Sequence, residues 1–466
     1  MGVYRMASVP ASPGEQSAGG QGEDEVEPSV LRRAVAASAI GNATEWFDYG
    51  IYAYLTTELT TAFFPGELGY LGTLLGFAIS FVLRPLGGFV WGPLGDRIGR
   101  QKVLSMTIIL MGVATFLIGV IPTYETIGWA APVLLFLLRI VQGFSTGGEY
   151  GGAATFMAEY APDRKRGFWG SFLEFGTLAG LTLAVLVVYA VESAIGEQAM
   201  EAYGWRIPFM IALPLAMIGL YIRTKLEDTP VFRDLEQHGE TEQAATGALR
   251  DLVVEFWKPI LALFGLVIAL NLINYTLLTY MPTYLQTTIG MDSSGADTLA
   301  VVGQVIMMLL IPAAGALSDR IGRKPCWWIS LIGIFVLAVP MYMLMAQGLV
   351  WAIVGFTVLG VIYLLQLGTI SATFPAMFPA HVRFAGMAIS YNVATAAFGG
   401  TAPLINESVI EATGDPLFPA YYMMGSCVIG MIALYFVIET KGASLNGREI
   451  PGLAEHRARL AAKAAR

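Results

Sequence analysis

Long apolar segments alternate with short polar ones along almost the whole chain. A helix that spans a membrane needs about 20 consecutive, mostly apolar residues. Twelve segments reach that length, at residues 33–57, 69–94, 103–122, 130–158, 167–191, 205–223, 257–286, 298–317, 326–346, 349–375, 384–408 and 418–438. The pattern predicts an all-α membrane protein with twelve transmembrane helices.

The composition supports this fold class and argues against several functions. Hydrophobic residues make up 55% of the chain and charged residues 13%, whereas soluble proteins have about 25% charged residues. Cys326 and Cys427 lie in different predicted spans and the three histidines are scattered, so we expect no disulfide, metal site or cofactor. The sequence has no phosphate-binding loop of the G-x-x-x-x-G-K-[ST] form, which disfavours ATP-driven transport. No nucleophile beside a base is recognisable either, so the chain is not expected to be an enzyme.

Basic residues are confined to the two tails and to one alternating set of loops. Of the 27 Lys and Arg residues, all but Arg84, Arg139 and Arg206 fall in this set or at its edges. The opposite loops contain no Lys or Arg, and they hold acids such as Glu67 and Asp292. Loops rich in Lys and Arg stay on the cytoplasmic side. Both termini are therefore predicted to be cytoplasmic, in a multi-pass protein of the inner membrane.

Polar segments divide the chain into parts. Residues 1–30 are rich in Gly, Ser, Pro and Glu, which predicts a disordered cytoplasmic tail. Residues 224–256 form a polar cytoplasmic loop between two groups of six spans, at 31–223 and 257–440. Residues 441–466 predict at most one short, basic helix, which either lies on anionic lipid or is simply solvated.

The two groups of spans are related by an internal repeat. "GPLGDRIGRQK" at 92–102 recurs as "GALSDRIGRKP" at 315–325. A weaker pair, "EYAPDRKRGFWG" and "MFPAHVRFAGMA", aligns Arg166 with Arg383. A duplicated six-span unit is typical of secondary transporters, which bind substrate near the mid-membrane between the halves. We therefore expect two pseudo-symmetric six-helix bundles.

The repeated loop resembles the loop signature of the major facilitator superfamily. It has the form G-x-L-x-D-R-x-G-R and follows both the second and the eighth predicted span. The resemblance implies the major facilitator fold, with these residues at the cytoplasmic face. We assign a conformational latch to Gly92, Asp96, Arg97, Arg100, Asp319, Arg320 and Arg323. The alternative is that the arginines only supply positive charge on the cytoplasmic side.

Longer motifs narrow the resemblance to the metabolite:proton symporter family, and within it to the betaine and proline branch. They include "GNATEWFDYGIYAY", "QGFSTGGEYGGAATFMAEYAPDRKRGFWGS" and "PAMFPAHVRF", and the likeness extends over residues 31–440. It implies symport of a zwitterionic compatible solute with protons by alternating access. Some members of this branch carry a long C-terminal coiled coil, which this chain lacks. Osmotic activation is therefore less well supported than transport.

Four acidic residues lie within predicted spans, where an ionisable side chain marks a functional site. Burial disfavours the charged form of a carboxyl group, which can then hold a proton near neutral pH. On the first span, Asn42, Glu45 and Asp48 share one helical face. The candidates for proton coupling are Asp48, Glu45, Glu174 and Glu149. Asp48, near mid-span, is preferred; the alternative is a structural role in which the acids pair with Arg84 or Arg139.

A quaternary ammonium has no N–H group, so aromatic faces bind it best. The candidates for substrate binding are Trp46, Tyr49, Tyr52, Phe144, Phe172, Tyr275, Asn271, Asn274 and Arg139. Arg139 is expected to bind the substrate's carboxylate, unless it forms a charge lock with Glu149 or Asp48. An acid at Glu174 resembles the betaine and proline branch. A fixed negative charge there favours an ammonium and repels a dicarboxylate.

Two other functions stay open. A proton symporter for organic acids such as 2-oxoglutarate, citrate or shikimate would need more binding-site cations than Arg84 and Arg139. A transporter-like membrane sensor would need a larger signalling domain than the two tails offer. The expected partners are a small zwitterion, protons and the lipid bilayer. Nucleic acid is not expected, and the sequence indicates no oligomeric state.

Overall fold

The computed structural model describes residues 27–64, 69–225, 228–237, 252, 254–447 and 449–464. Almost all of these residues are helical and none is in a strand, which confirms the predicted all-α class for the described part. Most of the predicted disordered tail and much of the predicted loop at 224–256 lie outside the described residues, as does Glu67.

The first half of the chain, here called the N-half, forms a bundle of long helices. They are α1 (Pro28–Tyr54), α3 (Gly69–Ile98), α4 (Arg100–Val120), α6 (Ala130–Tyr160), α8 (Phe172–Ile195), which follows the short α7 (Arg166–Gly170), and α10 (Arg206–Thr224). Helix α1 packs against α8 and α10, α3 packs against α6, and α4 packs against both α6 and α10. Short helices α2 (Thr56–Phe63), α5 (Tyr124–Ile127) and α9 (Glu197–Ala199) connect them.

The second half, here called the C-half, repeats this plan. Its helices are α13 (Trp257–Asn274), α14 (Met281–Thr287), α15 (Ser293–Ile321), α16 (Arg323–Met345), α17 (Leu349–Leu367), α18 (Ile370–Thr373), α19 (Arg383–Phe398), α20 (Ala402–Thr413) and α21 (Phe418–Phe436). Helix α13 packs against α21 and α19, and α17 packs against α15 and α16. A π-helical turn, η4 (Tyr275–Thr279), continues α13. The short helix α11 (Pro230–Gln237) lies between the halves in sequence, and α22 (Leu453–Ala464) follows the C-half.

Ten of the described helices are long and apolar enough to cross a membrane. Two of the twelve predicted spans are not among these ten. One corresponds to α1, and the other corresponds to α19 and α20 together. Helix α1 carries the buried polar residues Asn42, Glu45 and Asp48, which lower its hydropathy. The eleventh predicted span is divided between α19 and α20.

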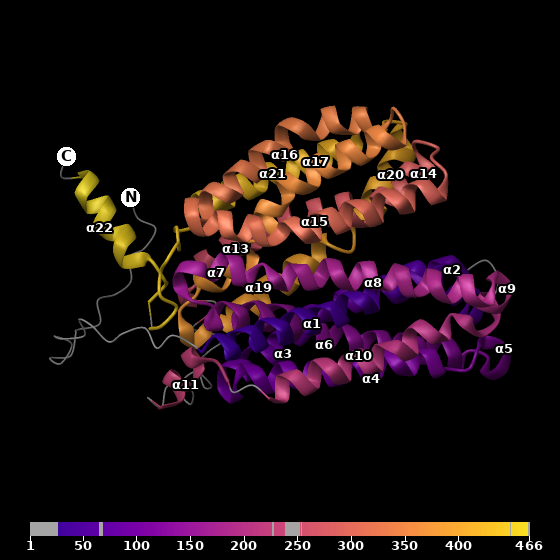
Figure 1. Cartoon of the computed structure of the whole chain (residues 1–466), viewed down its shortest axis with the longest axis horizontal. Helices are drawn as coiled ribbons and strands as arrows, with labels where there is room; N and C mark the ends of the chain where they lie inside the picture. The colour runs from indigo at the N-terminus through magenta and orange to yellow at the C-terminus, as the bar shows by residue number, and fades with distance from the viewer. Residues whose placement is uncertain are drawn as a thin grey trace.

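The long helices run between two ends of the molecule (Figure 1). Helices α11 and α22 lie at one end, here called the tail end, and α2, α5, α9, α14 and α20 lie at the opposite end, here called the far end. The halves approach each other at the tail end and diverge toward the far end (Figure 1). Across the halves, α19 packs against α3 and α6, and α15 packs against α7 and α8.

Glycines bring the helices of the N-half into close contact. A Cβ atom at Gly180 of α8 would lie 2.3 Å from the carbonyl oxygen of Ala43 on α1, and one at Gly176 would lie 2.2 Å from that of Ala39. Small residues of this kind allow membrane helices to approach backbone to backbone. The α1–α8 contact therefore fixes the polar face of α1 directly beside the start of α8.

The substitution Gly180→Val tests this contact. We expect it to destabilise the folded protein by about 1–3 kcal/mol, because the new side chain meets backbone that cannot rotate away. The loss should appear as a lower Tm of the detergent-purified protein. Gly425→Ala on α21 is the control, since a Cβ atom there meets nothing within 4 Å. Equal Tm values for the two variants would contradict the close packing.

Candidate functional site

A central cavity of about 270 Å³ lies between the two halves. The N-half contributes Trp46, Tyr150, Glu174 and Thr177, and the C-half contributes Leu270, Asn271, Asn274, Tyr363, Leu367, Ile370 and Tyr391. A second cavity of about 300 Å³ lies beside residues 437–450 and is lined almost entirely by apolar residues, with Thr440 as an exception. Ligand sites combine apolar walls with a few convergent polar groups, so the central cavity is the better candidate.

On the N-half side, Glu174 is the centre of a hydrogen-bond chain. Its carboxylate accepts hydrogen bonds from the Tyr150 hydroxyl and, at 3.0 Å, from the Thr177 hydroxyl. The Thr177 hydroxyl in turn accepts a hydrogen bond of 2.6 Å from the side-chain amide of Asn42. The glycine-mediated approach of α1 and α8 places Asn42 within reach of Thr177. The Glu174 carboxylate therefore accepts two hydrogen bonds and still lines the cavity.

The two halves meet at the cavity through stacked aromatic rings. The Tyr150 ring of the N-half stacks on the Tyr391 ring of the C-half, with centroids 4.2 Å apart and an interplanar angle of 19°. Trp46 lines the same space and is 8% exposed. The cavity thus combines one carboxylate with four aromatic side chains, which are Trp46, Tyr150, Tyr363 and Tyr391.

On the C-half side, the polar groups are neutral. The side-chain amide of Asn271 donates a hydrogen bond of 2.9 Å to Thr395. The Tyr363 hydroxyl donates a bond of 3.3 Å to the side-chain oxygen of Asn274. None of the described residues that line the cavity is Lys, Arg or His.

The structure does not bring Arg139 to this cavity. Its side chain is fully buried in the N-half and donates to Gly76, Ser80 and Gln142 at 2.8–3.1 Å. It also pairs with Asp48 at 3.3 Å. Gln142 donates a further bond of 2.7 Å to Asp48, so both oxygens of that carboxylate are satisfied. Arg139 forms the charge lock with Asp48 that was the alternative to substrate binding.

Glu45 forms the second ion pair in this region. Unlike Asp48, it has only one of its two carboxylate oxygens paired. One carboxylate oxygen lies 3.4 Å from the Arg84 guanidinium. The other oxygen, Oε2, is buried and has no hydrogen-bond partner among the described residues. Arg84 also donates to the Tyr49 hydroxyl at 3.3 Å and lies over the rings of Tyr49 and Phe81.

The remaining predicted site residues lie outside the cavity. Glu149 pairs with Arg223 and accepts a hydrogen bond from Thr107, which makes it part of a separate buried cluster. The aromatic candidates pack elsewhere: Tyr52 against Arg139, Phe144 against Trp91, Phe172 against Phe168 and Phe175, and Tyr275 against Phe81. Of the predicted set, Trp46, Glu174, Asn271 and Asn274 line the cavity.

Sequence reasoning did not select Tyr363 and Tyr391, although the structure places both at the cavity. Tyr363 precedes Gln366 by three residues, so it continues the polar face that runs through Thr369 and Thr373. Tyr391 directly precedes Asn392 in a predicted span. Helical spacing could therefore have found Tyr363, whereas Tyr391 faces the cavity only because α19 meets α6 across the halves.

At the tail end, two aspartates bind the backbone of the opposite half. Asp96 at the end of α3 accepts hydrogen bonds from the backbone N–H groups of Phe384 and Ala385 at 3.3 and 2.9 Å. Asp319 at the end of α15 accepts two bonds of 2.8 Å from Gly167 and Phe168. Carboxylates are favourable partners for the free N–H groups of a helix start. The repeated motif thus forms two equivalent contacts between the halves.

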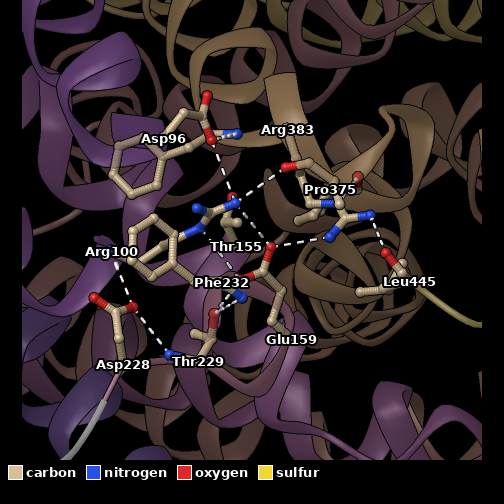
Figure 2. A network of polar contacts seen from close by, with 12 residues as sticks. Asp96, Arg100, Thr155, Glu159, Asp228, Thr229, Phe232, Pro375, Arg383 and Leu445 are labelled. Carbon is tan, nitrogen blue, oxygen red and sulfur yellow. Dashed lines mark hydrogen bonds and ion pairs between the residues drawn. The ribbon is translucent and has the colours of Figure 1, made fainter. Parts of the chain in front are cut away.

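A third contact between the halves centres on Glu159 (Figure 2). Its carboxylate pairs with Arg100 of the N-half at 3.3 Å and with Arg383 of the C-half at 2.9 Å. Arg323, the repeat of Arg100, pairs with Asp319 at 2.7 Å, as Arg100 pairs with Asp96 at 3.3 Å. Gly92 on α3 allows the two halves to approach closely here, because a Cβ atom at this position would lie 2.9 Å from Ala385 on α19.

Two predicted latch residues, Arg97 and Arg320, are exposed. For neither does the described part of the chain provide a side-chain hydrogen bond or ion pair. They fit the alternative reading, in which the arginine only supplies positive charge.

Two acids outside the repeated motif also cap helices at this end. Asp228 accepts a hydrogen bond of 3.1 Å from the backbone N–H of Arg100, at the start of α4 (Figure 2). Glu439 accepts bonds of 3.0 and 2.9 Å from Arg323 and Lys324, at the start of α16. Burial raises the pKa of the Asp228 carboxyl above its usual value. This cap therefore begins to lose its charge at a higher pH than an exposed aspartate would.

Residues 437–447, here called the C-terminal strap, run across both halves at the tail end. Arg166 of the N-half donates a hydrogen bond of 3.0 Å to the carbonyl oxygen of Ala443. Arg383 of the C-half donates one of 2.6 Å to that of Leu445. The strap therefore joins the two halves through its backbone.

Comparisons with known proteins agree with this architecture. Residues 39–403 match the Major Facilitator Superfamily. The glycine betaine/proline/ectoine/pipecolic acid transporter OusA of Dickeya dadantii is 43% identical over 432 residues, which cover 91% of this chain and 86% of that protein. The proline/betaine transporter of Escherichia coli is 41% identical over 434 residues, with the same two coverages. The ectoine/proline transporter ProP of Corynebacterium glutamicum is 41% identical over 438 residues, covering 91% and 87%.

Solved structures show the same fold at low sequence identity. The proton:xylose symporter XylE bound to 6-bromo-6-deoxy-D-glucose gives a TM-score of 0.73 at 19% identity, covering 90% of this chain and 98% of that structure. The inward open conformation of the xylose transporter XylE from E. coli gives 0.62 at 19% identity, covering 89% and 98%. The predicted major facilitator fold is confirmed. The chain belongs to the major facilitator superfamily, and it is a multi-pass membrane transporter rather than an enzyme.

Proposed function

We propose that this transporter takes up zwitterionic compatible solutes such as glycine betaine and proline, together with protons, by alternating access. The observation that carries the proposal is the central cavity, where the carboxylate of Glu174 stands among aromatic side chains. The printed names of the similar proteins point to the same substrates, since they include proline, betaine and ectoine.

The groups around Glu174 suit a methylated ammonium. Such a group cannot donate an N–H hydrogen bond, so it depends on aromatic faces and on a counter-charge. Each aromatic face contributes about 0.5–2 kcal/mol. Trp46, Tyr150 and Tyr391 supply the faces, and Glu174 supplies the negative charge.

The proton needs a carboxylate other than Glu174, because a symporter carries both ligands at once. Glu45 fits this role better than Asp48. Asp48 has both oxygens satisfied, whereas Glu45 leaves Oε2 buried and without a partner among the described residues. A buried oxygen without a donor is energetically costly, and protonation of that oxygen relieves the cost. Asp48 then serves mainly to hold Arg139 in place.

The tail end would face the cytoplasm of a cell whose inner membrane holds the protein. Support comes from the basic residues, which collect in the loops of this end. The contacts of Asp96, Asp319 and Glu159 join the halves on this side. Delivery of substrate to the cytoplasm would require all three contacts to separate.

An organic-acid substrate fits the cavity less well. A dicarboxylate needs cationic partners, and no described residue that lines the cavity is a cation. Arg84 and Arg139 are both engaged with acids inside the N-half. The negative charge of Glu174 would also repel such a ligand.

Counterflow in proteoliposomes with radiolabelled glycine betaine, proline and 2-oxoglutarate tests the substrate class. The reconstituted protein should exchange the first two and not the third. Glu174→Gln should weaken glycine betaine binding by at least about tenfold, since each factor of ten corresponds to about 1.4 kcal/mol. Glu192→Gln, an exposed position on the same helix, is the control and should leave exchange unchanged. Exchange of 2-oxoglutarate without exchange of glycine betaine would refute the assignment.

Proton coupling is tested with Glu45→Gln. The variant should lose accumulation driven by a pH gradient and keep substrate exchange, because the amide cannot take up and release the proton. Retained exchange also shows that the variant is folded despite the loss of Arg84's partner. Asp48→Asn in parallel distinguishes the two acids. If Glu45→Gln accumulates substrate normally and Asp48→Asn does not, Asp48 carries the proton instead.

A further inference from the structure

The C-half wall of the cavity includes a polar group that no other described residue binds. Asn274 lines the cavity and is 8% exposed. Its side-chain oxygen accepts the hydrogen bond of 3.3 Å from Tyr363. Its side-chain NH₂ group has no hydrogen-bond partner among the described residues. Two N–H donors are therefore available at the cavity.

Tyr363 fixes the orientation of this amide. The Tyr363 side chain is fully buried, and its hydroxyl also lies 3.3 Å from the carbonyl oxygen of Leu270, one turn before Asn274 on α13. Both acceptors of the hydroxyl thus belong to one helix. Because the side-chain oxygen of Asn274 faces Tyr363, the NH₂ group on the opposite side of the amide is directed away from Tyr363.

The negatively charged group and the neutral amide groups that line the cavity belong to different halves. The carboxylate of Glu174 belongs to the N-half, and the amides of Asn271 and Asn274 belong to the C-half. A zwitterion whose ammonium lies beside Glu174 would direct its carboxylate toward the C-half. With no Lys, Arg or His among the described lining residues, that carboxylate must be bound by neutral donors.

The two buried arginines of the N-half are poor alternatives. Arg139 uses its donors on Gly76, Ser80, Gln142 and Asp48. Arg84 is balanced by Glu45 and is not among the residues that line the cavity. To bind the ligand's carboxylate, either arginine would have to give up a buried anionic partner.

We propose that Asn274 binds the carboxylate of the zwitterionic ligand and that Tyr363 is the positioning residue that orients its amide. This inference rests on the proposed function and adds the specificity of the same site. The ligand then bridges the halves, with its cation on the N-half and its anion on the C-half. A cation that lacks the carboxylate contacts only Glu174 and the aromatic rings beside it, and binds more weakly.

Competition between two ligands tests the assignment. Choline has the quaternary ammonium of glycine betaine and a hydroxyl group in place of the carboxylate. Both are used to displace radiolabelled glycine betaine from the purified full-length protein in proteoliposomes. The wild-type protein should prefer glycine betaine. Asn274→Leu should weaken glycine betaine binding about ten- to hundredfold, as expected for a lost hydrogen bond to a charged group, and leave choline binding unchanged.

Tyr363→Phe tests the positioning role with a smaller change. It removes only the hydroxyl. It should therefore reduce the preference for glycine betaine over choline, but by less than Asn274→Leu does. Tyr342→Phe is the matched control, because the Tyr342 hydroxyl is buried without a hydrogen-bond partner among the described residues and lies outside the cavity. That variant should keep the wild-type preference.

The outcomes separate this inference from the proposed function. If Asn274→Leu weakens both ligands equally or neither, Asn274 does not bind the carboxylate, although the proposed function can stand. If Arg84→Lys loses the preference and Asn274→Leu keeps it, the arginine binds the carboxylate and the inference is overturned. If the wild-type protein binds neither glycine betaine nor choline, the proposed function fails and the inference fails with it.

Discussion

The arrangement of the two halves depends on carboxylates that bind backbone N–H groups across the interface. Asp96 and Asp319 each end a helix of one half and accept two hydrogen bonds from the first turn of a helix in the other. The first N–H groups of a helix have no partner within the helix, so each carboxylate satisfies donors whose positions are fixed by the helix of the other half. These contacts join the halves at the tail end, and the central cavity is lined by residues of both halves.

The internal repeat is not carried through to every residue, and the departures have structural consequences. Arg166 and Arg383 are equivalent by sequence, and Glu159 aligns with Ala376 in the same register. The N-half can therefore bind two arginines with one acid, whereas the C-half has no acid at that position. Arg166 pairs with Asp163 of its own half, whereas Arg383 pairs with Glu159 of the opposite half. The carbonyl oxygens of the strap accept hydrogen bonds from both arginines, so the two equivalent residues differ in their acidic partner and share the strap.

Sequence patterns predicted much of the fold, because span length, charge bias and a repeat are all local features. They also identified Glu174, Asn271 and Asn274, since polar residues inside spans are rare and conspicuous. They could not predict which acid meets which arginine, because that choice depends on rotation about the helix axis and on close glycine contacts. Arg223 looks like a loop-edge residue in sequence, yet it reaches back to pair with Glu149. Tyr391 lies at the cavity only through a contact between halves that no local pattern encodes.

The way the strap is held has a consequence for how its sequence can change. Arg166 and Arg383 bind the main-chain oxygens of Ala443 and Leu445, and the backbone N–H of Ala380 donates to Gly447. Every residue type offers the same carbonyl oxygen, so these bonds do not depend on the side chains of the strap. Substitutions at exposed positions of the strap such as Ser444 and Asn446 should be tolerated far better than insertions or deletions, which would move the carbonyl groups out of register with the arginines. Glu439, whose side chain caps α16, and the buried Leu445 are exceptions. Natural variation in this segment is thus expected in the composition of its exposed positions and not in its length.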